Sequence, residues 1–244
     1  MSSNVFPSIL FLLLLLVSAA QSDVVINTLN LCTFKIWLAS SPSGADFESE
    51  SSPGSTDIII LPDTWKGSIW ARTKCSTNAS NYFSCETGDC GSGKDYCRDP
   101  PPTYPVTLLN LDLNKKTVLS YEVSLNHGFN IPIRFEPLDG TLFGGDRKCP
   151  VVDCIADISN VCPSFLVAKN QNGAYVGCYS ACDALKDPKY CCTGKFTGPD
   201  CQPNEYSKTF KDLCNLAHTY PGDNDPPTYK CSEGTSFNIT FCAF

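Results

Sequence analysis

Residues 82–97 read YFSCETGDCGSGKDYC, a short segment that holds three cysteines. Gly91 and Gly93 lie between Cys90 and Cys97 with no helical pattern after them, so they do not form a phosphate-binding loop. Cysteine is also abundant beyond this segment, because the 244-residue chain contains 16 of them, an even number. What these cysteines do depends on the compartment in which the chain folds.

The start of the chain predicts secretion. Residues 9–17 read ILFLLLLLV, an apolar run that is shorter than the roughly 20 residues needed to cross a bilayer. The small residues Ala20 and Ser22 follow at the spacing that signal peptidase requires. We therefore expect residues 1–22 to be a signal peptide and residues 23–244 to be the mature, secreted protein.

In an oxidising compartment, 16 cysteines indicate eight disulfides. A zinc site at Cys178 and Cys182 is the alternative, but His127 and His218, the two histidines of the chain, lie in unrelated segments. Disulfides are therefore favoured, and no metal or cofactor is expected. Spacing alone leaves the pairing open.

The charge balance argues against nucleic-acid binding. Lys and Arg number 18 and Asp and Glu number 25, so the net charge is −7, whereas a nucleic-acid binder needs a concentrated basic patch. Hydrophobic residues make up 42% of the chain and charged residues 18%, which is typical of a globular protein with a buried core. The length allows one large domain or two small ones, and all-β folds commonly reach this size as a single unit. We expect the protein to be a monomer.

Short runs of alternating apolar and polar residues between residues 23 and 136 predict an all-β sandwich, because side chains in a strand alternate between its two faces. The clearest runs are residues 34–38, 68–72, 106–113, 118–125 and 129–135. If these strands are neighbours, one polar face carries Arg72, Asn110, Asp112 and Glu122.

The pattern changes after residue 148. Residues 149–201 contain eight cysteines and little hydrophobic periodicity, which predicts loops held by disulfides and a short helix near residues 180–185. Asn204 is a suitable N-cap for a helix whose apolar stripe would be Tyr206, Phe210, Leu213 and Ala217. Residues 236–241 predict a final strand.

The segment 82–97, with its Thr-Gly-Asp-Cys core, resembles the signature of thaumatin-like proteins, the plant pathogenesis-related family 5. Further matching motifs are WARTKC at 70–75, GFNIP at 128–132, YSAC at 179–182, YCCTG at 190–194, YSKTF at 206–210 and TFC at 240–242. The resemblance covers essentially all of residues 23–244. For a secreted plant protein, it implies a location in the apoplast or cell wall. It implies a mainly β fold: a β-sandwich of about residues 23–148 and 207–244, and a disulfide-rich subdomain of loops and short helices at about 149–206.

The resemblance also implies which cysteines pair. Carried over by their order, the pairs are Cys32–Cys242, Cys75–Cys85, Cys90–Cys97, Cys149–Cys231, Cys154–Cys214, Cys162–Cys178, Cys182–Cys191 and Cys192–Cys201. Two acceptor triplets for N-glycosylation begin at Asn78 and Asn238.

Defensive members of the family have a cleft lined by one arginine and four carboxylates. Carried over to this chain, the arginine falls on Arg72 and the last carboxylate on Asp223, whereas the other three positions hold Asn110, Glu122 and His127. Two of the four carboxylates are therefore replaced.

Two residues could modify this cleft. Asp112 lies two positions from Asn110 on the same strand face, so it could partly restore the lost charge. His127 could titrate near neutral pH inside the cleft, although a solvated turn residue is the simpler interpretation.

The resemblance implies three functions for such a cleft. The favoured one is defence without catalysis, through binding of fungal β-1,3-glucan or another cell-wall carbohydrate, with sugar rings stacked on aromatic side chains, or through perturbation of fungal walls or membranes. The second is weak hydrolysis of β-1,3-glucan, with Glu122 as acid and Asp223 as base or nucleophile. Hydrolysis needs two carboxyl groups about 5–5.5 Å apart for retention or about 6.5–9.5 Å for inversion. The third is inhibition of a digestive enzyme by the disulfide scaffold.

Overall fold

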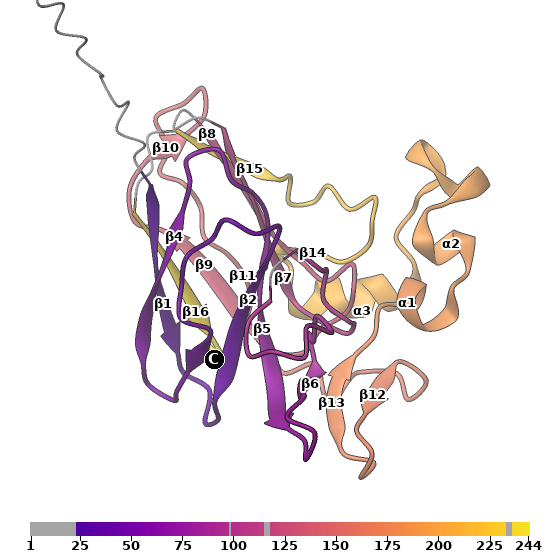
Figure 1. The fold of residues 1–244 in the computed structure, drawn as a ribbon. Coiled ribbons are helices and arrows are strands. Elements are labelled where there is room, and N and C mark those ends of the chain that lie inside the picture. Colours follow the sequence, from indigo (N-terminus) through magenta and orange to yellow (C-terminus); the bar gives the residue numbers. More distant parts are fainter. Residues whose placement is uncertain (1–22, 98, 115–117, 233–235) are drawn as a thin grey trace, which may run out of the picture.

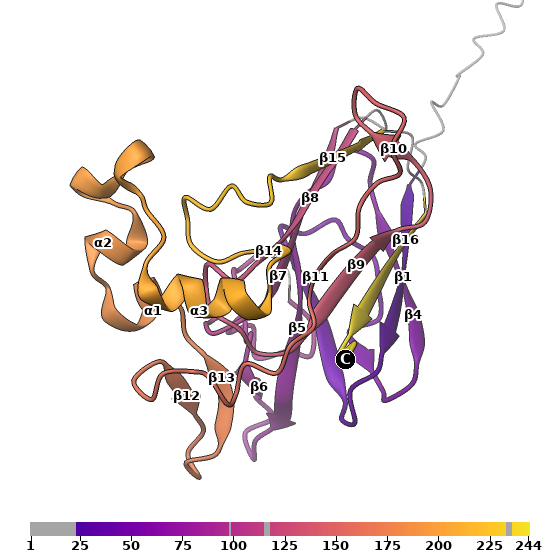
Figure 2. The ribbon, with the colours of Figure 1, turned by 180° about the vertical axis from the view of Figure 1, so that it is seen from behind.

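The computed structural model describes residues 23–97, 99–114, 118–232 and 236–244, so the predicted signal peptide at residues 1–22 lies outside the described residues. Two β-sheets pack face to face, and a smaller body of helices and loops projects from one side of them (Figures 1 and 2). We call this projecting body, residues 155–204, the arm. The arm lies within the segment, about residues 149–206, for which the family resemblance implies a disulfide-rich subdomain.

The first sheet has five strands in the described chain. In spatial order they are β11 (Val152–Cys154), β9 (Ile133–Pro137), β16 (Ser236–Phe241), β1 (Val24–Asn30) and β4 (Thr56–Leu61). Strand β1 pairs in parallel with β16 and antiparallel with β4. The first and last described strands therefore lie side by side in the middle of this sheet.

The second sheet is larger. Its order is β10 (Thr141–Leu142), β15 (Tyr229–Ser232), β8 (Val118–Ser124), β7 (Leu108–Asn114), β5 (Lys66–Thr77), β2 (Ile36–Ser41) and β3 (Glu50–Ser51), with β14 (Ala217–His218) beside β8 and β6 (Phe83–Thr87) beside β5. The neighbouring strands β5, β7 and β8 are antiparallel. They bring together segments that the sequence predicted as strands.

The core lies between the two sheets and is rich in aromatic rings. The ring of Phe135 stacks on that of Phe237 with centroids 5.5 Å apart and lies 5.1 Å from the ring of Tyr121. All three side chains are fully buried. Their inward positions follow the period of two in β8, β9 and β16, which confirms the predicted sandwich.

The arm contains a hairpin and several short helices. They are β12 (Val167–Lys169), β13 (Tyr175–Cys178), α1 (Ala181–Leu185), α2 (Pro188–Cys191) and the 3₁₀ turns η1 (Gly194–Phe196) and η2 (Gly198–Asp200), followed by α3 (Glu205–Leu213) at its base. Ser180 caps α1, and Asn204 caps α3 in a reciprocal pair of hydrogen bonds with Ser207. Both predicted helices are present.

Eight disulfides close the fold, and no described cysteine is free. Their partners are the same as those that the family resemblance implies. Cys32–Cys242 joins the two ends of the described chain, and Cys162–Cys178, Cys182–Cys191 and Cys192–Cys201 lie within the arm.

Three local expectations differ from the structure. The predicted strand at 129–135 begins only at Ile133, because Phe129 instead forms an isolated bridge with Cys178. The stripe on α3 is shorter than expected, since Leu213 is 38% exposed and Ala217 belongs to β14. Strand β11 pairs with β9, so the sandwich continues past residue 148.

Along the described ranges, no helix combines the length and the apolar character needed to cross a membrane.

Candidate functional site

A polar cleft lies on the outer face of β5, β7 and β8. The register places Ser68 opposite Asn110 and Asn110 opposite Glu122, so one row of polar side chains crosses three strands. The cavity measures about 380 Å³. Its lining consists of Lys66, Gly67, Ser68, Asn110, Leu111, Asp112, Ser120, Glu122 and Thr228. The predicted polar face is therefore present and hollowed.

Hydrogen bonds connect this row. The Ser68 hydroxyl donates to Oδ1 of Asn110 at 2.6 Å, and Nδ2 of Asn110 donates to Oε1 of Glu122 at 3.1 Å. Asp112 lies on the same face as Asn110, as predicted, and its carboxylate pairs with Nζ of Lys66 at 2.7 Å. Asp112 therefore brings its own counter-ion and does not restore a free negative charge to the cleft.

Glu122 is held by donors on every side. The Thr228 hydroxyl donates to its Oε2, and Nδ1 of His218 lies 3.1 Å from the same oxygen. Burial would raise the pKa of Glu122, but hydrogen bonds from His218, Thr228 and Asn110 outweigh burial and lower this pKa to about 2. Glu122 is therefore ionised at every physiological pH.

Asp223 is held as tightly, in the loop that follows β14. Its Oδ2 accepts the backbone N–H of Thr219 at 2.7 Å and pairs with Nζ of Lys211 at 2.7 Å. Its Oδ1 accepts the backbone N–H of Asp225. With only 4% of its side chain exposed, Asp223 braces the loop and does not line the cleft.

The structure places Arg72 outside the cleft, which corrects the expectation from the family pattern. Arg72 is fully buried, and its guanidinium donates to the carbonyl oxygens of Lys94 and Asp95 and lies 5.3 Å from the centre of the Phe83 ring. Burial lowers the pKa of Arg72 to about 10, partly offset by Asp89 and Asp95. The loop of the 82–97 signature thus covers Arg72 and uses it as an internal anchor.

His127 is also absent from the cleft lining. Its ring stacks on Tyr104 with centroids 3.9 Å apart, and its Nδ1 lies 2.9 Å from Oδ2 of Asp183 on α1. His127 is thus neither a cleft residue nor a purely solvated one, because it joins the sandwich to the arm.

Sequence reasoning missed Ser68, Thr228 and His218. Ser68 has the same strand phase as Arg72, so its place on the polar face could have been inferred from the period of two. Thr228 and His218 lie in and beside an irregular loop, where no periodic signal exists. Aromatic rings were expected for stacking on sugars, but none belongs to the described lining of the cleft.

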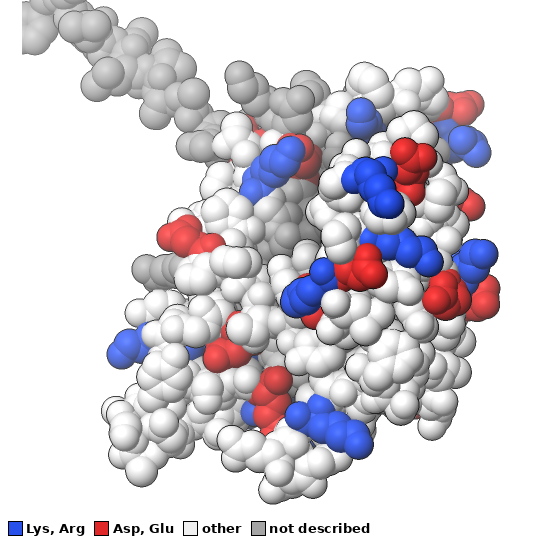
Figure 3. Space-filling view, turned by 90° about the vertical axis from the view of Figure 1, so that its right-hand side faces the viewer, with Lys and Arg blue, Asp and Glu red and all other residues white. Residues whose placement is uncertain are grey.

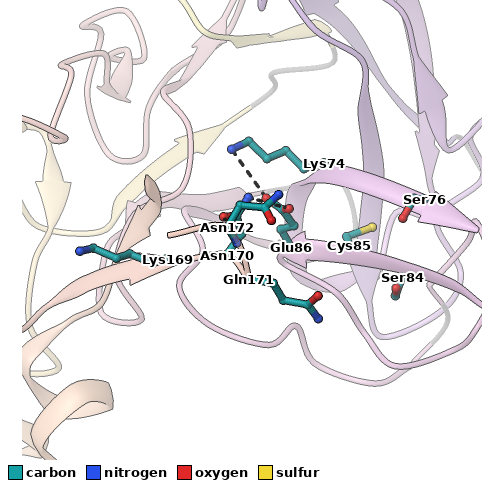
Figure 4. Close-up of a pocket in the computed structure, with 9 residues that line it drawn as sticks. All are labelled: Lys74, Ser76, Ser84, Cys85, Glu86, Lys169, Asn170, Gln171 and Asn172. Carbon is teal, nitrogen blue, oxygen red and sulfur yellow. Dashed lines mark hydrogen bonds and ion pairs between the residues drawn. The ribbon is translucent and has the colours of Figure 1, made fainter. Parts of the chain in front are cut away.

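A second polar groove, of about 430 Å³, lies between the β5–β6 hairpin and the β12–β13 turn (Figure 4). Asn170 crosses it by donating from Nδ2 to Oε1 of Glu86 at 3.0 Å, and Lys74 pairs with the other oxygen of Glu86 at 3.6 Å. The groove holds no residue of the predicted cleft. Positive and negative side chains are interspersed over the side of the molecule that carries the arm (Figure 3).

Both acceptor triplets lie on the surface. Asn78 is exposed in the turn between β5 and β6, where its Oδ1 accepts the N–H groups of Ser80 and Tyr82. Asn238 is half-buried in β16, where Asn27 donates to it at 3.4 Å. Glycosylation of either remains a prediction.

Comparison with known proteins gives a consistent result. The model of the Thaumatin family matches residues 30–243. Thaumatin-like protein 1 of Pyrus pyrifolia is 40% identical over 195 residues, which cover 79% of this chain and 78% of that protein. A protein of Prunus avium named glucan endo-1,3-beta-glucosidase is 36% identical over 224 residues, covering 87% of this chain and 88% of its own.

Among solved structures, the thaumatin-like xylanase inhibitor TLXI aligns over 89% of this chain and 99% of its own, with a TM-score of 0.46 and 18% identity. The family model and the relatives, together with the eight disulfides and the sandwich, show that the chain belongs to the thaumatin family.

Proposed function

We propose that this member of the thaumatin family is a secreted defence protein that binds β-1,3-glucan in the cleft without hydrolysing it. The observation that carries the proposal is that Glu122 and Asp223, the two carboxylates that hydrolysis would use, each bind at least three internal donors. Groups used in this way hold the protein together and leave nothing for bond cleavage.

Glu122 is unsuited to act as the general acid of glucan hydrolysis. A glycosidase needs a carboxyl group that remains protonated near neutral pH, which requires a raised pKa. The pKa of Glu122 is lowered to about 2, so this residue carries no proton to donate to a leaving oxygen. An ionised carboxylate accepts from all three donors of Glu122. A neutral carboxyl group would satisfy these donors less well.

Asp223 is unsuited to act as the base or nucleophile of hydrolysis, because a substrate cannot reach its carboxylate. A nucleophilic carboxylate must reach within about 3 Å of the sugar. The side chain of Asp223 is 4% exposed and both of its oxygens accept hydrogen bonds from within the same loop or from Lys211. Only a large rearrangement of that loop would bring Asp223 to a substrate.

Binding of glucan requires neither a protonated carboxyl group nor an accessible nucleophile. Sugar hydroxyls both donate and accept hydrogen bonds, and the cleft offers amide, hydroxyl, carboxylate and ammonium groups from Asn110, Ser120, Asp112 and Lys66. The name of the Prunus avium relative supports β-1,3-glucan as the ligand class. Eight disulfides fit an oxidising compartment and so support secretion.

The test is co-sedimentation of the disulfide-intact protein with insoluble β-1,3-glucan, together with an assay for released reducing sugar. We expect binding without release. Asn110→Ala should weaken binding about two- to tenfold, because one hydrogen bond contributes roughly 0.5–1.5 kcal/mol. Asp112→Asn tests the exposed end of the same row. Asn172→Ala, an amide in the second groove, is the matched control and should bind like the wild type.

Three outcomes would overturn the proposal. Sugar release that disappears in Glu122→Gln or Asp223→Asn would establish an endo-β-1,3-glucanase. Absence of both binding and release, or equal weakening by Asn110→Ala and Asn172→Ala, would remove the cleft as a glucan site and turn attention to the enzyme-inhibitor hypothesis.

A further inference from the structure

The ring of His218 lies beneath one wall of the cleft with an acceptor at each nitrogen. His218 is 6% exposed in β14, which pairs in parallel with β8. Nδ1 lies 3.1 Å from Oε2 of Glu122, and Nε2 lies 2.6 Å from the carbonyl oxygen of Pro226. The ring therefore connects β8 to the loop formed by residues 219–228, which we call the wall loop.

Both contacts need a donated hydrogen. A backbone carbonyl such as that of Pro226 can only accept, and the Glu122 carboxylate already accepts from Asn110 and Thr228. A neutral imidazole has only one N–H, so one of its two nitrogens would present a lone pair to another lone pair. The geometry is satisfied when His218 is an imidazolium and Glu122 is ionised.

We propose that His218 is a proton-operated latch: when protonated it fastens the wall loop to β8, and when it loses its proton the loop is released. Thr228, at the end of this loop, both lines the cleft and donates to Glu122, so release would also widen the cleft. The latch itself is a property of the loop, whereas its effect on glucan affinity rests on the function proposed above.

The charges around the ring support this assignment. Glu122 faces it from β8, Asp223 lies in the wall loop, and Lys211 of α3 pairs with Asp223 and donates to the carbonyl oxygen of Ala217. Burial lowers the pKa of His218, but the hydrogen bond and charge of Glu122, the Pro226 carbonyl and the charge of Asp223 outweigh it, and the pKa is raised above its ordinary value.

Because the pKa of His218 is raised, the direction in which pH acts on the wall loop can be worked out. A histidine whose pKa is higher in the folded protein than in the open state stabilises the closed form below its ordinary pKa of about 6.5, and this contribution is lost as the pH rises through the folded pKa. The wall loop should therefore be closed in an acidic extracellular fluid and should open in alkali.

The experiment measures the His218 ring by NMR and hydrogen exchange of the wall-loop amides on the full mature protein, from about pH 5 to about pH 9. The chain has two histidines, so His127→Gln assigns the ring signals. We expect His218 to titrate above about 6.5 and wall-loop exchange to rise about tenfold through that pKa, relative to His218→Gln at the same pH. The comparison at equal pH removes the intrinsic base catalysis of exchange. His127→Gln should keep the wild-type response.

A His218 ring that titrates at or below about 6.5, or a wild-type loop whose exchange matches that of His218→Gln at every pH, would overturn the latch. Glucan co-sedimentation over the same pH series separates the two proposals. If the wall loop opens as the pH rises through the pKa of His218 but the protein never binds glucan, the latch is supported and the proposed function is overturned. Binding that is unchanged while the loop opens would limit the latch to the loop alone.

Discussion

The sandwich and the arm are held together by different forces. In the sandwich, interlocking rings such as those of Phe135 and Phe237 are completely buried between the two sheets. In the arm, Phe165 is 52% exposed, and three disulfides lie within about fifty residues. The arm buries a few apolar side chains, such as Ile158 and Leu166, and its cross-links add to their contribution by restricting the unfolded chain.

The largest expected effect separates these two forces directly. Phe237→Ala opens a cavity in the sandwich and should lower the free energy of unfolding by about 3–5 kcal/mol. Phe165→Ala, the matched change in the arm, should cost less than about 1 kcal/mol, because its ring is half in solvent. Denaturant titrations with disulfides intact measure both. Equal losses would mean that the arm has an apolar core of its own.

The next effect concerns the cross-links. Replacing Cys192 and Cys201 together by serine removes a short loop closure in the arm, for which the chain-entropy model gives about 2–3 kcal/mol. We expect limited proteolysis to cut between these residues while the near-ultraviolet circular dichroism of the sandwich is kept. Loss of that signal would show that the sandwich depends on the arm.

A smaller effect is expected at the joint between the two parts. Asn204→Ala removes the N-cap of α3, whose Oδ1 accepts from the N–H groups of Tyr206 and Ser207, and should cost about 1 kcal/mol. Amide exchange in α3 should increase accordingly. Lys208→Ala, on the exposed side of the same helix, is the control and should leave exchange close to that of the wild type.

The smallest effect depends on pH. Burial would raise the pKa of Asp183, but the hydrogen bond and charge of His127, with help from Ser180 and Lys186, lower it. The stability from this carboxylate is therefore present above its ordinary pKa of about 4 and is lost as the pH falls through the lower folded value.

Exchange of the α1 amides should accordingly rise by a few fold between about pH 5 and about pH 2, while the amides of β8 and β9 stay protected. His127→Gln removes one partner and should reduce the size of this acid response. If α1 and the sandwich loosen together, the two regions are a single cooperative unit.

Much of the architecture could be predicted from particular residues. The motif at 82–97 and the order of the cysteines identified the family pattern, and the disulfides follow that pattern. The alternation in residues 106–125 correctly placed Asn110, Asp112 and Glu122 on one face. Asn204 marked the start of α3 because capping depends on local sequence.

The candidate site was harder to predict, for two physical reasons. Strand periodicity tells which face a side chain occupies but not what covers that face, so Arg72 was placed in an open cleft although Lys94 and Asp95 close over it. A family position also gives no information about hydrogen-bond saturation. Glu122 and Asp223 lie where carboxylates were expected, yet two donors of Glu122, His218 and Thr228, are distant in the chain, and those of Asp223 lie in an irregular loop and on α3.

The pairing of β1 with β16 has a consequence for biosynthesis. Asn27 and Asn238 are in register although 211 residues separate them. On the other side of β1, Thr28 pairs with Asp57 of β4, which follows only 29 residues later. At a synthesis rate of about 5–20 residues per second, one edge of β1 waits roughly 10 to 40 s for its partner. The five-stranded sheet is therefore completed only after β16 has left the ribosome, and the Cys32–Cys242 disulfide cannot form before Cys242 has been translated.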